Sequence, residues 1–273
     1  FLTKNQASDT LHYAVNENGD LNVIPEFTNI LYNQLDNKKG WSLNDFDAVR
    51  QMESTGIPIG KYCQSRHGIA TLSNKIYIFK PVAEDDKYYY LESKDGCFPI
   101  EKSICRNVVN SNKLNSEVLF ESIIEKLIFP YYIKERQAII IGESELKTTF
   151  PCTYAYLLSQ REQLAERDKG KTDKYPTWYA YGRTQSLIMP RYKLFFPKFA
   201  NKPVHCVLRD DADLMLYNGV AFVSDDLDKL QVLKSILDSN LFWNYLIKNA
   251  KPYSTGYYSL SGVDIKNFCI PIP

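Results

Sequence analysis

Arg183 and Gln185 are the side chains of this 273-residue chain whose chemistry best fits the edges of nucleic-acid bases. They stand two positions apart, just after Trp178-Tyr179-Ala180-Tyr181-Gly182. A guanidinium can form two parallel hydrogen bonds with guanine, and a carboxamide can do so with adenine. The motif therefore predicts contacts to bases in a major groove. The alternative left open by the sequence is that Trp178 anchors a core and that Gly182-Arg183 forms a turn with an ion pair.

A basic and aromatic segment, residues 169–209, surrounds this motif. It carries nine Lys and Arg against one acid, Asp173, so its local charge is 9 − 1 = +8 in a chain of formal net charge +1. Eight aromatic residues are interleaved with the basic ones. Because cations neutralise phosphates and aromatic rings stack on bases, the segment predicts binding of a polyanion such as nucleic acid. The residues expected to contact phosphates are Lys169, Lys171, Lys174, Arg191, Lys193, Lys198 and Lys202.

A second motif suggests hydrolytic chemistry. The apolar run Ile139-Ile140-Ile141 is followed by Glu145 and Lys147 in a Glu-x-Lys spacing. At the end of a strand in a metal-dependent nuclease, such a pair supplies a metal-binding carboxylate and a lysine that steadies the attacked phosphate. The second carboxylate, expected shortly upstream, is not obvious, since Glu135 stands in a charged turn. A Mg²⁺-dependent nuclease using Glu145 and Lys147 is therefore kept as an alternative function.

Other catalytic and metal-binding patterns are absent from the sequence. There is no Gly-rich phosphate loop, no Gly-x-Gly-x-x-Gly, no Gly-x-Ser-x-Gly and no pair of adjacent prolines, which excludes Asn-Pro-Pro-Tyr. The six cysteines lack the spacing of a zinc site, and the three histidines do not cluster with them. No apolar run approaches the roughly 20 residues that span a bilayer. We therefore expect no catalytic residue, metal, cofactor or membrane partner for this chain, and a reduced, cytoplasmic protein.

Short apolar runs and turn signals indicate the elements that must position these residues. Residues 1–59 are a polar lead-in that ends in an expected helix over 42–53, capped by Ser42 or Asn44. Further helices are expected over 150–169, behind an Asp226 cap, and over 240–249. A hairpin is expected around Lys94-Asp95-Gly96. Single strands are expected at 76–79, 127–133, 138–141, 191–197, 204–208, 220–223 and 269–270. The pattern predicts an α+β fold with a mixed twisted sheet, flanking helices and a C-terminal helical pair.

Several blocks of the chain, taken in order, resemble one family: the C-terminal target-recognition domain of N6-adenine DNA methyltransferases of restriction–modification systems, the TaqI-like specificity domain. Each block is short, but a shared order across residues 60–273 is hard to obtain by chance. The blocks are Gly68-Ile69-Ala70-Thr71 with Asn74, Ile128-Phe129-Pro130-Tyr131, Phe150-Pro151 with Tyr156-Leu157 and Leu164-x-x-Arg167, Trp178-Tyr179 with Gly182-Arg183-x-Gln185, Leu237-Asp238-Ser239-Asn240-Leu241, and Ile270-Pro271-Ile272-Pro273.

The resemblance implies sequence-specific recognition of double-stranded DNA by residues 60–273. It adds Thr71, Asn74 and Tyr257 to Arg183 and Gln185 as candidates for contacts to bases. The catalytic half of the family is missing, so S-adenosylmethionine and the flipped adenine are expected on a methyltransferase domain or subunit in cis or trans, and this fragment is not expected to be catalytic alone.

The parent protein would be an adenine-specific DNA methyltransferase or a fused methylase–endonuclease, and residues 1–59 would pack on or link to its methyltransferase domain. Two further alternatives stay open. One is the specificity subunit of a multi-subunit restriction enzyme, and the other is an aromatic-rich protein-interaction module.

Overall fold

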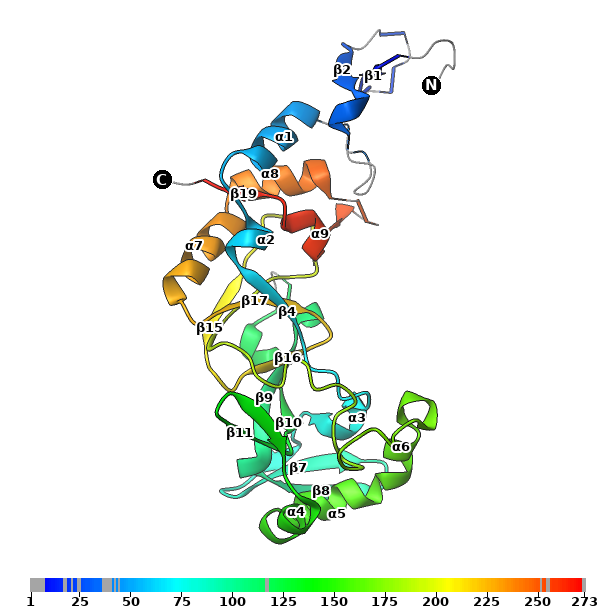
Figure 1. Cartoon of the computed structure of the whole chain (residues 1–273), viewed down its shortest axis with the longest axis vertical. Coiled ribbons are helices and arrows are strands. Elements are labelled where there is room, and N and C mark those ends of the chain that lie inside the picture. The colour runs from blue at the N-terminus through cyan, green and yellow to red at the C-terminus, as the bar shows by residue number, and fades with distance from the viewer. Residues whose placement is uncertain are drawn as a thin grey trace.

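A computed structural model describes residues 8–16, 19–20, 22–23, 26–35, 41, 43, 45–115, 118–250, 252–253 and 256–271. The molecule is elongated, with an N-terminal hairpin at one end and the helices α4 (Glu143–Thr149) and α5 (Pro151–Ser159) at the other (Figure 1). The expected α+β class is confirmed, with the strands divided among several small sheets. Within the described ranges, no helix is long and apolar enough to cross a membrane.

The half of the molecule that contains α4 and α5 is built on a mixed four-stranded sheet in the order β16-β9-β10-β5. Strand β16 runs parallel to β9, and the other two pairs are antiparallel. A three-stranded meander packs against α5 and contains the hairpin expected at Lys94-Asp95-Gly96. The strands are β5 (Ile78–Phe79), β6 (Ala83–Glu84), β7 (Tyr88–Ser93), β8 (Gly96–Glu101), β9 (Cys105–Asn110), β10 (Ile124–Ile128) and β16 (Met215–Tyr217).

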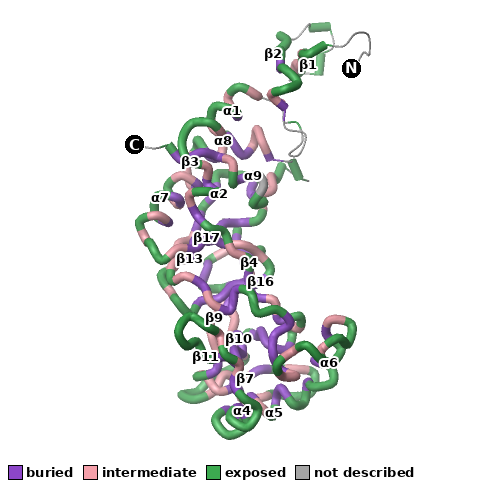
Figure 2. The backbone as a smooth tube through the Cα atoms, in the orientation of Figure 1, coloured by how far each residue is buried: buried purple, intermediate pink, exposed green. Residues whose placement is uncertain are grey.

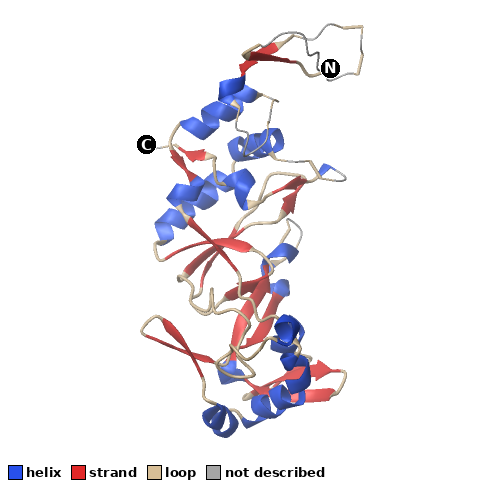
Figure 3. Cartoon of the chain, turned by 45° about the vertical axis from the view of Figure 1, so that its right-hand side comes forward, coloured by secondary structure: helices blue, strands red, loops and turns tan. Residues whose placement is uncertain are grey.

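Pro130 divides the strand that was expected over 127–133. Proline has no N–H to donate to a neighbouring strand, so β10 ends at Ile128. The chain continues as a separate hairpin of β11 (Tyr131–Lys134) and β12 (Gln137–Ile140), which stands apart from the larger sheets (Figure 3). The expected strand at 76–79 is also wrong in its first half. Residues Asn74–Tyr77 instead form a helical turn, α3. A short apolar run that is buried on every side does not distinguish a helix from a strand, so the sequence pattern did not reveal this turn.

The other half of the molecule contains an antiparallel four-stranded sheet in the order β15-β13-β17-β4. Helix α7 (Leu227–Leu237) packs on this sheet and against α8 (Asn240–Asn249). Asp226 accepts a hydrogen bond from the backbone N–H of Lys229, so this predicted cap and the C-terminal helical pair are confirmed. The strands are β4 (Gln64–His67), β13 (Tyr192–Phe195), β15 (Val207–Asp210) and β17 (Val220–Ser224).

The helix expected over 150–169 is broken into three pieces. Helix α5 ends at Ser159, α6 covers Arg161–Ala165, and a 3₁₀ turn, η5, covers Arg167–Gly170. Asp168 and Lys169 have left-handed backbone conformations (φ 54° and 60°), which end any regular helix. Buried residues run along the middle of the molecule in both halves, and exposed residues cover its helices and turns (Figure 2).

The segment from α1 (Phe46–Ser54) to α2 (Ile59–Tyr62) packs on the C-terminal elements of the same chain. The Tyr245 hydroxyl on α8 donates to Glu53 of α1 at 2.7 Å, and β3 (Ile57–Pro58) pairs with β19 (Cys269–Ile270). The strand expected at 269–270 is confirmed, whereas the caps Ser42 and Asn44 lie outside the described residues. The boundary between residues 59 and 60 stays a prediction. The remaining elements are β1 (Thr10–Tyr13), β2 (Thr28–Leu31), β14 (Phe199–Ala200), β18 (Tyr258–Ser259), α9 (Gly262–Ile265) and the 3₁₀ turns η1 (Tyr32–Gln34), η2 (Lys102–Ile104), η3 (Ser111–Lys113) and η4 (Phe120–Ile123).

Candidate nucleic-acid interface

Arg167 holds the segment that carries Arg183 and Gln185 from inside the protein. Its side chain is buried, and its guanidinium donates hydrogen bonds to four backbone carbonyls. The Nε atom bonds to Leu164 (2.9 Å), Nη1 bonds to Ala180 (2.7 Å) and Thr71 (3.3 Å), and Nη2 bonds to Trp178 (2.7 Å). Because these carbonyls belong to α6, to the loop before α3 and to residues 178–180, one side chain joins three separate parts of the chain. Four of its five N–H donors thus have an acceptor, which makes a buried cation tolerable.

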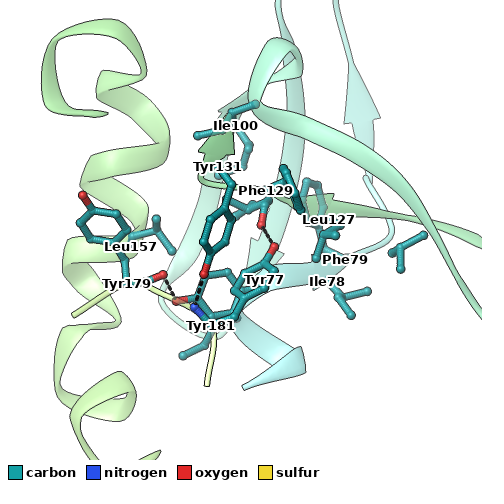
Figure 4. Close-up of a cluster of buried hydrophobic side chains, with 14 of the residues drawn as sticks. Tyr77, Ile78, Phe79, Ile100, Leu127, Phe129, Tyr131, Leu157, Tyr179 and Tyr181 are labelled. Carbon is teal, nitrogen blue, oxygen red and sulfur yellow. Dashed lines mark hydrogen bonds between the residues drawn. The ribbon is translucent and has the colours of Figure 1, made fainter. Parts of the chain in front are cut away.

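Buried tyrosines fix the same segment from its other side (Figure 4). The Tyr179 hydroxyl donates to the carbonyl of Ile141 at 2.6 Å, and the Tyr77 hydroxyl donates to the carbonyl of Tyr179 at 2.8 Å. The Tyr181 hydroxyl donates to the carbonyl of Ile128, and its ring meets that of Tyr77 edge-on at 4.9 Å. Burial raises the pKa of all three tyrosines. The Tyr-Ala-Tyr part of the motif is therefore core.

Trp178 also belongs to this anchor rather than to an exposed binding surface. It is partly buried, its Nε1 donates to Glu143 at 3.0 Å, and the guanidinium of Arg161 lies 5.3 Å from its ring centre. Gly182 is buried against Leu72: a Cβ at position 182 would lie 2.4 Å from two side-chain carbons of that residue. The motif is thus a buried anchor up to Gly182 and reaches the surface at Arg183.

Four of the expected phosphate and base contacts, together with Asp168, form a basic loop on this surface. Arg183 is exposed, and its Nη1 lies 3.5 Å from a carboxylate oxygen of Asp168, which Lys174 also contacts at 2.6 Å. The hydrogen bond from Lys174 lowers the pKa of Asp168, and the charge of Arg183 adds to this effect. Lys169 and Lys171 are exposed in the same loop. We call residues 168–174 with Arg183 the Asp168 loop.

Lys193 was expected at the DNA surface, and this expectation is wrong. Its side chain is fully buried, and its Nζ donates to the carbonyls of Pro190 (2.9 Å), Arg191 (3.3 Å) and Asp211 (2.7 Å). Burial lowers the pKa of Lys193 to about 8. It shares a face of β13 with Phe195, which packs in a buried apolar cluster, so this face of the sheet is covered. Lys193 stabilises the turns around β13 and does not reach a ligand.

The remaining basic candidates lie on other elements. Arg191 is exposed and forms an ion pair with Asp210 across the β13–β15 pair. Lys198 and Lys202 are exposed on either side of β14, which pairs with β18. Tyr257, exposed, directly precedes β18, and the register of this two-stranded sheet (Ala200 opposite Tyr258) puts it at the Lys202 end rather than beside Lys198. The basic segment of the sequence is therefore divided into at least two surface regions.

Thr71 was expected to contact a base, and the structure contradicts this because the residue is fully buried. Its hydroxyl donates to Oδ1 of Asn74 at 2.7 Å and accepts from the backbone N–H of Ser73 at 3.0 Å. Thr71 therefore shapes the loop before α3. Asn74 is partly buried, and Gln185 is exposed.

An open cavity of about 690 Å³ lies beside this loop. Arg183 stands next to it, because the backbone of Arg183 pairs with that of Ala70, which lines the cavity. Sequence reasoning identified Asn74 but missed several other polar residues, which come from distant segments and carry no shared motif. Lys94-Asp95-Gly96 and Asn218-Gly219 carry local turn signals, which predict a turn and not a cavity. The side chains that line the cavity include those of Leu72, Asn74, Lys75, Lys94, Gln163 and Asn218.

The nuclease alternative does not fit the observed geometry. Glu145 and Lys147 lie on α4 rather than at the end of a strand. Residues two positions apart on a helix are separated by about 200° around its axis, so the Glu145 carboxylate and the Lys147 ammonium cannot face the same metal-bound phosphate. Glu145 instead accepts a hydrogen bond from the Tyr132 hydroxyl at 3.0 Å. Among the residues that the structure describes, there is no group of three or more His, Cys, Asp or Glu that could hold a metal ion.

Comparison with known proteins gives two sequence relatives and a structural one, while no family model matches the chain. The chain is 28% identical over 144 residues to the type II restriction enzyme and methyltransferase RM.Eco57I of Escherichia coli, across 50% of this chain and 14% of that protein. It is 24% identical over 152 residues to the type II methyltransferase M.MjaIV of Methanocaldococcus jannaschii, across 55% of this chain and 48% of that protein.

Among solved structures, the chain is similar to the type IIL restriction–modification enzyme MmeI in complex with DNA. The TM-score is 0.47 at 11% identity, with 96% of this chain and 31% of that chain covered. The matches span less than half the length of both curated relatives. The sequence relatives are thus restriction–modification proteins and methyltransferases, as the resemblance implied.

Proposed function

We propose that this chain recognises double-stranded DNA as the target-recognition region, residues 60–273, of a restriction–modification adenine methyltransferase. The observation that carries the proposal is the similarity, over half of the chain, to RM.Eco57I and M.MjaIV. RM.Eco57I is a type II restriction enzyme and methyltransferase, and M.MjaIV is a type II methyltransferase.

The geometry of the Asp168 loop supports this proposal. Recognition of a duplex needs phosphate contacts that set the position of the protein, and base contacts that read the sequence. Lys169, Lys171, Lys174 and Arg183 are exposed cations on a segment that Arg167 holds from within. A surface that is already ordered loses little conformational entropy on binding. Lys198 and Lys202, on either side of β14, would supply a second group of phosphate contacts.

The chemistry of methylation belongs, in this proposal, to the rest of the parent enzyme. S-adenosylmethionine and the target adenine would be held there, and this chain would contribute no catalytic residue. Residues 1–59 would connect the recognition region to that catalytic part.

Salt dependence of DNA binding tests the proposal. Anisotropy of a labelled duplex of mixed sequence is measured from roughly 50 to 200 mM salt, where loss of phosphate contacts has a large effect. Replacing Lys171, Lys174 or Arg183 by alanine should each reduce the slope of log K against log salt by about 1. Lys87→Ala, an exposed lysine between β6 and β7, is the matched control and should leave the slope unchanged.

Two results would count against the proposal. One is absence of binding at the lowest salt, and the other is an equal loss in the Lys87→Ala control. The same titration with Mg²⁺ also tests for cleavage. DNA cleavage that Lys147→Ala abolishes would replace recognition by a nuclease function.

A further inference from the structure

We propose that the cavity beside Arg183 is the place where base edges are read, by the carboxamides of Asn74, Gln163 and Asn218 and by the apolar side chain of Leu72. This inference rests on the proposed DNA-binding function. It deepens that function by assigning the residues that determine sequence preference.

Separate parts of the chain meet at this cavity. Leu72 comes from the loop before α3, Asn74 from the first position of α3, Gln163 from α6, and Asn218 from the turn between β16 and β17. Lys94, from the β7–β8 turn, lines it as well. Convergence of polar side chains from distant segments on one hollow is typical of a ligand site.

The chemistry of the lining fits base edges. Side-chain amides present a donor and an acceptor together, which matches the N6 and N7 atoms of adenine. Gln163 and Asn218 are exposed, and their side chains have no hydrogen-bond partner among the described residues. Asn74 uses its Oδ1 to accept from Thr71, which leaves its amide N–H groups for a ligand.

Leu72 has an unusual conformation that the surrounding backbone imposes. Its φ is 60°, in the left-handed region that costs a leucine energy, and its side chain is 42% exposed. The N–H groups of Gly182 and Arg183 donate to the carbonyls of Thr71 and Ala70, both at 3.1 Å, so the loop is held against residues 182–183. Strained residues concentrate at functional sites. An exposed apolar side chain held beside an arginine suits contact with the methyl group of thymine.

The charges around the cavity suit a polyanion. Lys75, Lys94 and Glu166 line it, which gives 2 − 1 = +1, and Arg183 stands next to them. The cations can contact phosphates that flank the bases. The carboxylate of Glu166 can accept a hydrogen bond from the amino group of cytosine and would disfavour bases that lack a donor there.

Selection from a library of randomised duplexes, followed by sequencing of the bound fraction, tests the inference. The wild-type chain should enrich a defined sequence. Gln163→Ala and Asn218→Asp should each lose preference at one position by roughly 5- to 100-fold, and Leu72→Ala should relax preference at a thymine. Asn218→Asp is chosen because aspartate tolerates the left-handed backbone at position 218 (φ 50°). Affinity for duplexes that lack the enriched sequence should stay within about twofold for Gln163→Ala, since phosphate contacts supply that affinity.

The controls are Gln231→Ala on α7 and Asn244→Ala on α8, exposed amides at the other end of the molecule, and both should keep the enriched sequence. Circular dichroism confirms that each variant is folded. A wild-type chain that binds no duplex would refute the proposed function as well. Binding with an enriched sequence that Gln163→Ala, Asn218→Asp and Leu72→Ala all leave intact would refute the cavity assignment alone. Binding without any enriched sequence would refute it too.

Discussion

Arg167→Met should destabilise the whole chain, because it removes the side chain that joins three segments. Methionine keeps a flexible chain of similar length but has no N–H to donate. The carbonyls of Leu164, Thr71, Ala180 and Trp178 would each lose a charged donor. The variant therefore isolates the hydrogen bonds of the guanidinium from its packing.

The magnitude follows from those four contacts. A hydrogen bond with a charged group contributes about 1.5–3 kcal/mol, so four would give roughly 6–12 kcal/mol. Taking a guanidinium out of water costs several kcal/mol, and the substitution recovers that cost. We therefore expect the free energy of unfolding to fall by about 3–5 kcal/mol, a large share of the roughly 5–15 kcal/mol that stabilises a typical domain.

Urea unfolding, followed by tryptophan fluorescence and by circular dichroism, measures this loss. The midpoint should fall while the slope m is unchanged, since the same surface is exposed on unfolding. Arg50→Met, on the exposed side of α1, is the matched control and should stay within about 0.5 kcal/mol of wild type. Arg167→Lys should recover little, because one ammonium cannot reach carbonyls on three segments. A loss below about 1 kcal/mol would refute the role given to Arg167.

Gly68→Ala would place a Cβ 2.4 Å from a backbone oxygen of β16, so the melting temperature should fall by about 5–10 °C, whereas Gly142→Ala meets nothing within 4 Å. Thermal melts that show equal shifts for the two would contradict this packing. Burial raises the pKa of Tyr131 and Tyr156 to about 12 from the ordinary value of 10.0. Because the pKa of each tyrosine is higher in the folded than in the unfolded state, its contribution to the free energy of unfolding is complete below pH 10. This contribution is lost as pH rises from 10 to 12. The urea midpoint should therefore decline between pH 10 and 12, in step with tyrosinate absorbance. A midpoint that stays constant over this range would contradict the burial of these two hydroxyls. Asp168→Asn should raise affinity for duplex DNA by roughly three- to tenfold at low salt, because it releases two cations from an ion pair. An unchanged affinity would show that these cations do not face the DNA.

Local signals in the sequence were sufficient for some elements. The Asp226 cap and the β7–β8 hairpin depend on residues within a few positions, so their sequence patterns determine them. The break at Pro130 also has a local cause, but the apolar run over 127–133 favoured one continuous strand. The breaks within 159–170 are local as well, but the helical spacing of the apolar residues over 150–169 favoured one continuous helix.

The failures came from contacts between distant parts of the chain. Lys193 is of a residue type that usually lies on the surface, yet it shares a face of β13 with Phe195, and distant segments cover that face. Thr71 is polar and stands in a loop, but Arg167 closes that loop from a position 96 residues away. The cavity residues Gln163 and Asn218 were missed because only the folded chain brings them together.

Four buried side chains under the Asp168 loop hold it through its backbone and not through its side chains. Arg167, Tyr77, Tyr179 and Tyr181 all donate to main-chain carbonyls. Every amino acid supplies such a carbonyl, so the anchor does not depend on which side chains the loops carry. Positions 183 and 185 can then be varied without loosening the frame beneath them. If the proposed function holds, a chain built in this way can acquire new DNA targets by successive surface substitutions, each tested on an unchanged scaffold, and it offers the same freedom to a designer.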